Sequence, residues 1–257
     1  MLAELTAGAV ADAALREDSV SLAAIEAAAI RAPAPLDALS ALARSSQVKV
    51  IAEVKRASPS RGELATIVDP AALAKLYELG GASAISVLTE ERKFRGSLAD
   101  LRAVREAVAV PVLRKDFIAT PYQVFEARAA GADMVLLIVA ALQPTTLTSL
   151  YRLVGDLGMT VLVETHTAQE VDVAVELGAE MIGVNARDLT TFALNRDLFA
   201  SVVERIPAGT IRVAESAVRD ASDVQRYRDA GADVVLVGEA LVTSDPVVTL
   251  SNFLAVS

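Results

Sequence analysis

Several short apolar runs in this sequence end in side chains that can transfer protons. Glu53 and Lys55 close one run, and Lys115, Glu164 and Glu215 each close another. A lysine and a carboxylate can serve as acid and base when burial and neighbouring charges adjust their pKa values. Residues two apart on a strand share a face, so Glu53 and Lys55 point to the same side. The pattern indicates proton transfers on an anionic molecule.

Ion pairs that only close the rim of a fold are the alternative explanation for these charges. For Glu215 or Asp188 taken alone, the two explanations have equal weight. For Lys55, Lys115 and Glu164 together the structural explanation is weaker, because burying charge for structure alone is costly.

Polar residues at the ends of three runs suit the binding of an anion. Asn185 and Arg187 are also two residues apart and share a face. Phosphate often binds the loops after the last two strands of an α/β barrel, on backbone N–H groups and the start of a short helix. The residues that occupy those loops here are Ser216, Ala217, Gly238 and Glu239. A tight strand-to-helix turn is the alternative, but the position favours phosphate.

Two aromatic residues and one polar loop complete the candidate site. Phe94 and Phe117 come just after apolar runs, where they could clamp an aromatic ring instead of filling a core. The loop Ser58–Gly62 is polar and ends in glycine, which is typical of a mobile lid. His166, the single histidine of the chain, is expected to be an ordinary loop residue.

Composition excludes several classes of function. Asp plus Glu total 33 against 24 Lys plus Arg, a net charge of −9, which argues against nucleic-acid or anionic-membrane partners. With no cysteine and one histidine, disulfides, thiolate catalysis and a Ser-His-Asp triad are excluded, and a metal site is not expected. No apolar run reaches the roughly 18 residues of a membrane span, and no signal peptide is evident, so we expect a cytoplasmic protein.

A repeat in the sequence predicts the elements that position these residues. Gly81, Gly131, Gly178 and Gly231 recur about every 50 residues, each ending a helix-like segment just before an apolar run. Four more apolar runs lie between them. The eight predicted strands are Val48–Val54, Ser83–Leu88, Pro111–Leu113, Met134–Val139, Met159–Glu164, Met181–Val184, Ile211–Glu215 and Val234–Val237.

These strands are almost continuously apolar, as expected when both faces of a parallel sheet are buried. Helices are predicted between them at Pro70–Leu79, Leu98–Val108, Pro121–Ala130, Thr146–Leu157, Ala168–Leu177, Arg196–Arg205 and Ala221–Ala230. Even spacing without a switch point favours a closed barrel over a doubly wound sheet. We therefore expect an α/β fold, a (β/α)8 TIM barrel, forming a single domain over residues 1–257.

Residues 1–47 are expected to form a helical extension packed on the barrel. Ala11–Arg31 has a helical pattern, Ala32–Pro35 interrupts it, and Leu36–Arg44 has a second short helical pattern. The interruption is too short and too apolar for a linker between domains.

Seven strings of residues resemble the indole-3-glycerol phosphate synthase family, in the order in which that family carries them. They are Ile51–Ser60, Phe94–Leu98, Pro111–Phe117, Val161–Glu164, Ile182–Leu189, Ala214–Ser216 and Leu236–Leu241. The resemblance implies a cofactor-independent carbon–carbon lyase of tryptophan biosynthesis. Its reaction closes the indole ring of 1-(2-carboxyphenylamino)-1-deoxyribulose 5-phosphate and releases CO2 and water.

The resemblance also implies roles for individual residues. Lys115 would be the general acid, Glu164 would assist dehydration and Glu53 would be the third catalytic group. The substrate would be bound by Lys55, Ser58, Phe94, Phe117, Asn185, Arg187, Glu215, Ser216, Ala217, Gly238 and Glu239. Lys55 and Arg187 would hold its charged ends, and the two phenylalanines would flank its ring. A monomer or weak homo-oligomer with this one phosphorylated partner is expected.

Two positions depart from the family pattern, and two alternatives remain open. Ala217 stands where the family usually has glycine, at a cost on the order of 1 kcal/mol if φ is positive. Thr165 stands where the family more often has an aliphatic residue, which affects the placement of Glu164. The alternatives are a barrel resembling phosphoribosylanthranilate isomerase, which relies on a cysteine that this chain lacks, and a catalytically inactive phosphate-binding barrel.

Overall fold

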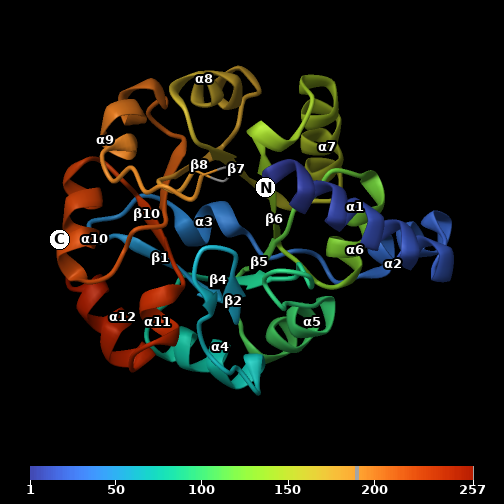
Figure 1. Cartoon of the computed structure of the whole chain (residues 1–257), viewed down its shortest axis with the longest axis horizontal. Coiled ribbons are helices and arrows are strands. Elements are labelled where there is room, and N and C mark those ends of the chain that lie inside the picture. Colours follow the sequence, from blue (N-terminus) through green and yellow to red (C-terminus); the bar gives the residue numbers. More distant parts are fainter. Residues whose placement is uncertain (189–190, 257) are drawn as a thin grey trace.

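Eight parallel strands close into a barrel in the order β1-β10-β9-β8-β7-β6-β5-β4 (Figure 1). The computed structural model describes residues 1–188 and 191–256, so Leu189, which ends one of the quoted strings, lies outside the described residues. The closed barrel confirms the predicted fold. Its strands are β1 Lys49–Val54, β4 Ala84–Leu88, β5 Val112–Lys115, β6 Met134–Ile138, β7 Thr160–Thr165, β8 Met181–Asn185, β9 Ile211–Glu215 and β10 Val234–Val237.

Helices surround the barrel, and the predicted helix ends are confirmed by their glycines. Gly81, Gly131, Gly178 and Gly231 all have positive φ, between 78° and 99°, which glycine adopts without a Cβ penalty. The helices are α4 Pro70–Leu79, α5 Leu98–Ala107, α6 Pro121–Ala129, α7 Pro144–Asp156, α8 Ala168–Glu176, α9 Leu198–Val202, α10 Ala221–Asp229, α11 Glu239–Val242 and α12 Pro246–Leu254, with 3-10 turns at Val139–Ala141 and Val203–Arg205.

The strands separate two apolar layers by simple alternation. On β1, Val50 and Ala52 pack outward against the helices, whereas Ile51 packs inside the barrel. The interior layer also contains Leu113, Leu162, Met181, Val213 and Leu236. Because residues two apart share a face, the next inward residue toward the carboxyl end of each of these strands belongs to the barrel mouth.

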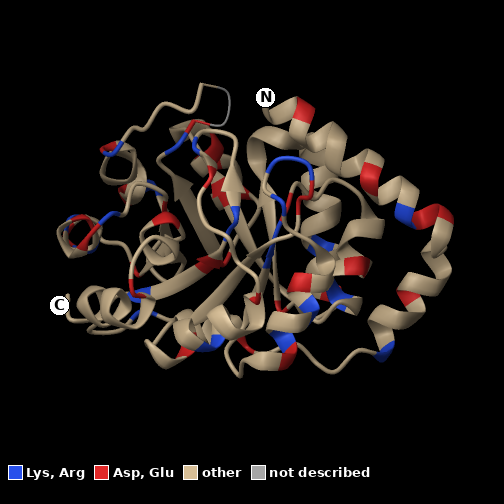
Figure 2. Ribbon diagram, turned by 60° about the horizontal axis from the view of Figure 1, so that its bottom comes forward, with Lys and Arg blue, Asp and Glu red and all other residues tan. Residues whose placement is uncertain are grey.

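The N-terminal extension begins with two helices rather than the predicted single one. α1 spans Leu2–Ser19 and α2 spans Leu22–Arg31, and α3 follows at Ala38–Leu42. The expectation of one helix over residues 11–31 is wrong because Val20 is extended and the hydroxyl of Ser21 accepts a hydrogen bond from the N–H of Ala24, which starts α2. Figure 2 shows α1 and α2 as an arm along one side of the barrel, whereas α3 packs Ala38 and Leu42 against the interior apolar layer (Figure 1).

Side chains of α6 hold this arm. Arg16 on α1 pairs with Glu126, and Arg128 donates to the carbonyl of Ala32 just after α2.

The predicted lid contains a small hairpin that the sequence did not reveal. β2 (Ala57–Ser58) pairs antiparallel with β3 (Gly62–Glu63), and Gly62 takes a positive φ of 71°. Arg61 of the hairpin lies 2.8 Å from Glu239 at the start of α11, which ties the loop to the end of the neighbouring strand β10. Among residues 1–188 and 191–256, no helix is long and apolar enough to cross a membrane.

Candidate active site

The ammonium group of Lys115 lies at the centre of the barrel mouth between two buried carboxyl groups. Its Nζ is 3.4 Å from Glu164 Oε2 and 3.7 Å from Glu215 Oε2. These residues lie at the carboxyl ends of β5, β7 and β9, one step above the interior apolar layer. Burial alone would lower the pKa of Lys115, but Glu164, Glu215 and Glu53 together raise it well above its usual value. Lys115 is therefore charged and able to donate a proton.

The two carboxyl groups beside Lys115 differ in charge. Burial and the neighbouring Glu164 carboxylate raise the pKa of Glu215 well above its usual value. Burial would also raise the pKa of Glu164, but the positive charges of Lys115 and His166 outweigh it and hold that pKa far below its usual value. Two such close carboxyl groups do not both ionise, so Glu164 is the carboxylate and Glu215 carries the proton.

Glu53 and Lys55 form the predicted pair at the end of β1. Lys55 Nζ donates to Glu53 Oε1 at 2.6 Å, and Ser86 Oγ on β4 donates to Glu53 Oε2 at 3.4 Å. Burial would raise the pKa of Glu53, but Lys55 and Lys115 hold it below its usual value. Gly238 leaves room for this pair, because a Cβ there would lie 2.7 Å from Glu53 Oε1. Gly238 therefore shapes the acid–base cluster as well as the predicted phosphate loop.

The expectation that His166 is an ordinary loop residue is wrong. Its side chain is 8% exposed, and its Nε2 lies 3.2 Å from Glu164 Oε1. Its Nδ1 lies 3.3 Å from Glu170 Oε2 on α8. The same two-residue rule that paired Glu53 with Lys55 would have placed His166 on the side of Glu164.

Thr165 does not disturb Glu164. Its side chain points to the opposite face of β7, where its hydroxyl donates to the carbonyl of Gly183 at 2.8 Å.

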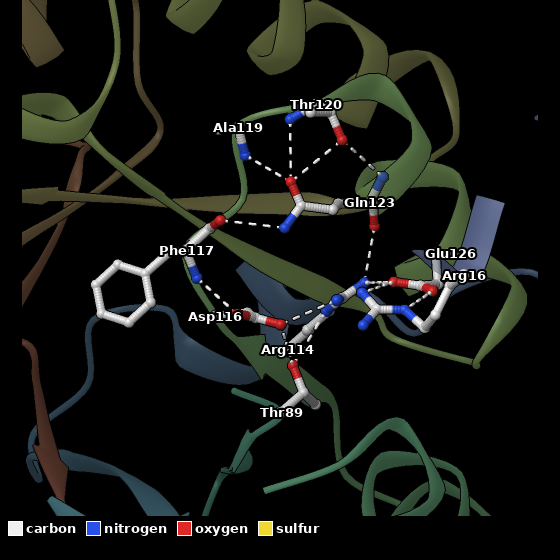
Figure 3. Close-up of polar contacts among 9 residues, drawn as sticks. All are labelled: Arg16, Thr89, Arg114, Asp116, Phe117, Ala119, Thr120, Gln123 and Glu126. Atoms are coloured by element: carbon white, nitrogen blue, oxygen red, sulfur yellow. Dashed lines mark hydrogen bonds and ion pairs between the residues drawn. The ribbon is translucent and has the colours of Figure 1, made fainter. Parts of the chain in front are cut away.

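The two predicted aromatic residues meet at the mouth. The ring centroids of Phe94 and Phe117 are 6.1 Å apart with their planes inclined by 43°. The backbone of Phe117 is fixed on both sides, since its N–H donates to Asp116 Oδ1 and its carbonyl accepts from Gln123 Nε2. In Figure 3 its ring points away from these polar groups.

A buried arginine behind Lys115 anchors the end of β5. Arg114 points to the face opposite Lys115 and is fully buried. Figure 3 shows its guanidinium between Asp116, at 2.9 Å, and Glu126, at 3.0 Å. Glu126 also binds Arg16 of α1, so one network joins the N-terminal arm to the strand that carries Lys115.

The expected phosphate loop has a strained backbone. Ser216 and Ala217 have φ of 67° and 61°, which L residues adopt at a cost. Ser216 Oγ donates to Asn185 Oδ1 at 2.8 Å, and the same oxygen accepts from the N–H of Arg187 at 3.0 Å. These contacts hold the loops after β8 and β9 together. The side chain of Glu239 binds Arg61, so only its backbone can serve an anion.

A cavity of about 300 Å³ lies at this mouth of the barrel. The structure brings all fourteen predicted residues to it: Glu53, Lys55, Ser58, Phe94, Lys115, Phe117, Glu164, Asn185, Arg187, Glu215, Ser216, Ala217, Gly238 and Glu239. Within the described part of the chain, no three His, Asp or Glu side chains are arranged to hold a metal ion.

Sequence reasoning missed the role of Gly183 in the middle of β8. A Cβ at this position would lie 2.1 Å from Glu215 Oε1 and 3.1 Å from a methyl group of Leu162. The Glu215 carboxyl group therefore occupies the space that a side chain at position 183 would fill. A glycine inside an otherwise apolar strand often marks such a close approach, and this signal was present in the sequence.

Comparison with known proteins identifies the family. Residues 2–251 match the model of the indole-3-glycerol phosphate synthase family. The chain belongs to this family. The enzyme of that name from Leifsonia xyli subsp. xyli is 67% identical, covering 98% of this chain and 97% of the relative. Those from Mycolicibacterium vanbaalenii and Mycobacterium tuberculosis are 60% and 56% identical, each covering 96% of this chain and 90% of the relative.

Family membership confirms the resemblance and supports a decarboxylating lyase of tryptophan biosynthesis over the isomerase and the inactive barrel. Solved structures with low sequence identity share the fold. N-acetylmannosamine-6-phosphate 2-epimerase from Clostridium perfringens matches with a TM-score of 0.64 at 15% identity, covering 80% of this chain and 90% of that one. 3-Hexulose-6-phosphate synthase from Salmonella typhimurium matches with a TM-score of 0.62 at 18% identity, covering 81% and 98%.

Proposed function

We propose that this chain converts 1-(2-carboxyphenylamino)-1-deoxyribulose 5-phosphate to indole-3-glycerol phosphate, CO2 and water, with Lys115 and Glu164 as its central acid and base. The observation that carries the assignment is the Lys115 ammonium lying 3.4 Å from the Glu164 carboxylate in a buried mouth. Family membership supports the reaction, and the geometry supports the roles.

The first step requires a proton donor. The ring carbon that bears the carboxylate forms a bond to the ketone carbon, and the ketone oxygen takes a proton from Lys115. Glu53 helps by keeping Lys115 charged in its buried site. Loss of CO2 then restores the aromatic ring.

The second step requires an acid and a base together. The new hydroxyl leaves as water while a proton leaves the neighbouring carbon. Glu215 holds a proton and Glu164 does not, and adjacent carboxyl groups with separated pKa values provide such a pair. Glu164 takes the proton from carbon, and Glu215 gives its proton to the departing hydroxyl. One proton then passes from Glu164 back to Glu215, and solvent restores the proton that Lys115 gave up.

Substrate binding uses the rest of the mouth. The phosphate would bind the backbone N–H groups of the loops at Ser216–Ala217 and Gly238–Glu239, with Arg187 nearby. The carboxylate would bind Lys55. The anthranilate ring would lie against Phe94 and Phe117, and Ser58 on the hairpin would cover it.

We further propose that residues 1–257 act as one domain, in the cytoplasm, as a monomer or weak homo-oligomer. The network from Arg16 to Arg114 supports a single unit, because it joins the N-terminal arm to the active-site strand. The absence of cysteine suits a reducing compartment. Sedimentation equilibrium across a range of concentrations tests the oligomeric state.

Indole formation tests the function directly. Purified chain mixed with the carboxyphenylamino substrate should develop indole fluorescence, and Lys115→Gln and Glu164→Gln should each reduce kcat by about 10²–10⁴-fold. The exposed Glu176→Gln on α8 is a control that removes one carboxylate far from the site and should match the wild type. Wild-type turnover in both active-site variants would overturn the assignment.

A further inference from the structure

The single histidine of this chain bridges two carboxyl groups, one of which belongs to the acid–base cluster. Its Nε2 lies 3.2 Å from Glu164 Oε1 and its Nδ1 lies 3.3 Å from Glu170 Oε2. Since each ring nitrogen faces a carboxylate oxygen, pairing with both requires a proton on each nitrogen, which makes the ring an imidazolium. Burial would lower the pKa of His166, but Glu164 and Glu170 raise it to about 10.

Glu170 is held in place by the start of α8. Its Oε2 accepts from the backbone N–H of His166 at 2.8 Å, and its Oε1 accepts from the hydroxyl of Thr167 at 3.2 Å. Thr167 in turn caps α8, accepting from the N–H of Glu170. The carboxylate that faces Nδ1 is therefore fixed by backbone geometry, which fixes the imidazole as well.

The histidine approaches the oxygen of Glu164 that Lys115 does not use. Lys115 is near Oε2, whereas His166 is near Oε1. The 3.2 Å between His166 Nε2 and Glu164 Oε1 is an ion-pair distance. Among the described residues, Nε2 has no partner in hydrogen-bonding geometry. Catalytic contacts of this kind often tighten only when the substrate is bound. Glu164 thus lies between two positive charges, while at Glu215 burial and the Glu164 carboxylate outweigh the attraction of Lys115 and the smaller attraction of His166.

We propose that His166 is a positioning residue which, held by Glu170, orients Glu164 and decides which of the two central carboxyl groups is the base. This inference rests on the proposed role of Glu164. With the imidazolium beside Glu164, the proton shared by the pair resides on Glu215. Without it, Glu164 competes for that proton, and the acid and base needed for dehydration are no longer distinct.

The charged groups that face this cluster come from five elements. Glu164 lies on β7, Glu170 on α8, Lys115 on β5, Glu215 on β9 and Glu53 on β1. Removing the imidazolium leaves Lys115 as the one cationic side chain within ion-pair distance of Glu164 among the described residues. An opposite charge within about 4–6 Å lowers a carboxyl pKa by one unit or more. The pKa of Glu164 should therefore rise by about that amount.

Kinetics of two variants test the proposal. His166→Gln keeps a polar side chain without the charge, and Glu170→Gln leaves the histidine without its anchoring carboxylate. We expect His166→Gln to lower kcat about tenfold or more with KM within about twofold of wild type, and to move the acid limb of the kcat–pH profile up by about one pH unit or more. Glu170→Gln should act in the same direction with a smaller effect, and Glu176→Gln should change nothing.

A spectroscopic measurement covers the possibility that a variant folds poorly. Because the chain has one histidine, 15N-histidine labelling of the untagged wild type gives a single imidazole signal. We expect an imidazolium at pH 8. A neutral imidazole titrating near pH 6.5 would overturn the proposal, as would wild-type kcat and an unmoved acid limb in both folded variants.

The outcomes also separate this inference from the proposed function. Full activity in Glu164→Gln would overturn the assignment of the base, whatever the histidine does. Loss of activity in Glu164→Gln, together with normal behaviour of His166→Gln and Glu170→Gln, would overturn the inference alone.

Discussion

Gly183→Ala should separate activity from stability in this enzyme. The added Cβ would lie 2.1 Å from Glu215 Oε1, whereas ordinary contacts begin at 3.4 Å, so the carboxyl group must retreat by about 1.3 Å. Displacing a reacting group by about 1 Å costs on the order of 10²-fold in rate. We therefore expect kcat for indole formation to fall by about 10²-fold.

The loss in the free energy of unfolding of Gly183→Ala should be small by comparison. The atom displaced is the end of a side chain beside a cavity, and the other contact, to a methyl group of Leu162 at 3.1 Å, requires a shift of only a few tenths of an ångström. Overpacking of this kind costs about 1 kcal/mol in the free energy of unfolding, at the low end of its usual range, and replacing glycine within a strand partly offsets it. Urea unfolding of Gly183→Ala should show this small loss.

Gly155→Ala is the matched control. Gly155 lies within α7, and no atom is within 4 Å of a Cβ built there. This variant should gain about 0.5–1 kcal/mol in the free energy of unfolding and keep wild-type kcat. A folded Gly183→Ala enzyme with kcat within threefold of wild type would refute the argument that this glycine makes room for Glu215.

Three further predictions address other parts of the site. Ala217→Gly should relieve the strain at φ 61°, raising the free energy of unfolding by up to about 1 kcal/mol and lowering KM modestly; a higher KM would contradict this. Arg114→Met should cost about 3–5 kcal/mol in urea unfolding, because it leaves buried carboxylates without their partner, and a loss below 1 kcal/mol would show that the network is dispensable. In the proposed mechanism Glu215 acts in its protonated form, so kcat of the wild type should fall as pH rises through the raised pKa of that group, and Glu215→Gln, although slower, should lack this alkaline limb.

Much of the barrel could be predicted because its signals are local. Each of the four repeating glycines ends a helix in the left-handed conformation, and each following apolar run is a buried strand. The two-residue period then placed Glu53 and Lys55 on one face. The break at Val20–Ser21 was missed because both flanking segments are helical in composition and the serine cap was overlooked.

The remaining features depend on contacts between distant segments. Two-residue strands such as β2 and β3 carry no periodicity, and they form because they face each other across a tight turn. The proton on Glu215 follows from a neighbour on another strand, which composition does not reveal. The sequence shows Gly183 as a glycine inside an apolar strand, which indicates a close approach. Which group approaches it, the Glu215 carboxyl group, follows only from the structure.

A crystal structure with indole-3-glycerol phosphate bound would test the central claim most directly. We predict the phosphate on the backbone of the loops at Ser216–Ala217 and Gly238–Glu239, with the indole ring against Phe117. Lys115 and Glu164 should lie within hydrogen-bonding reach of the newly formed ring. A product bound at the other end of the barrel, or at this mouth with its ring out of reach of Lys115, would contradict the account.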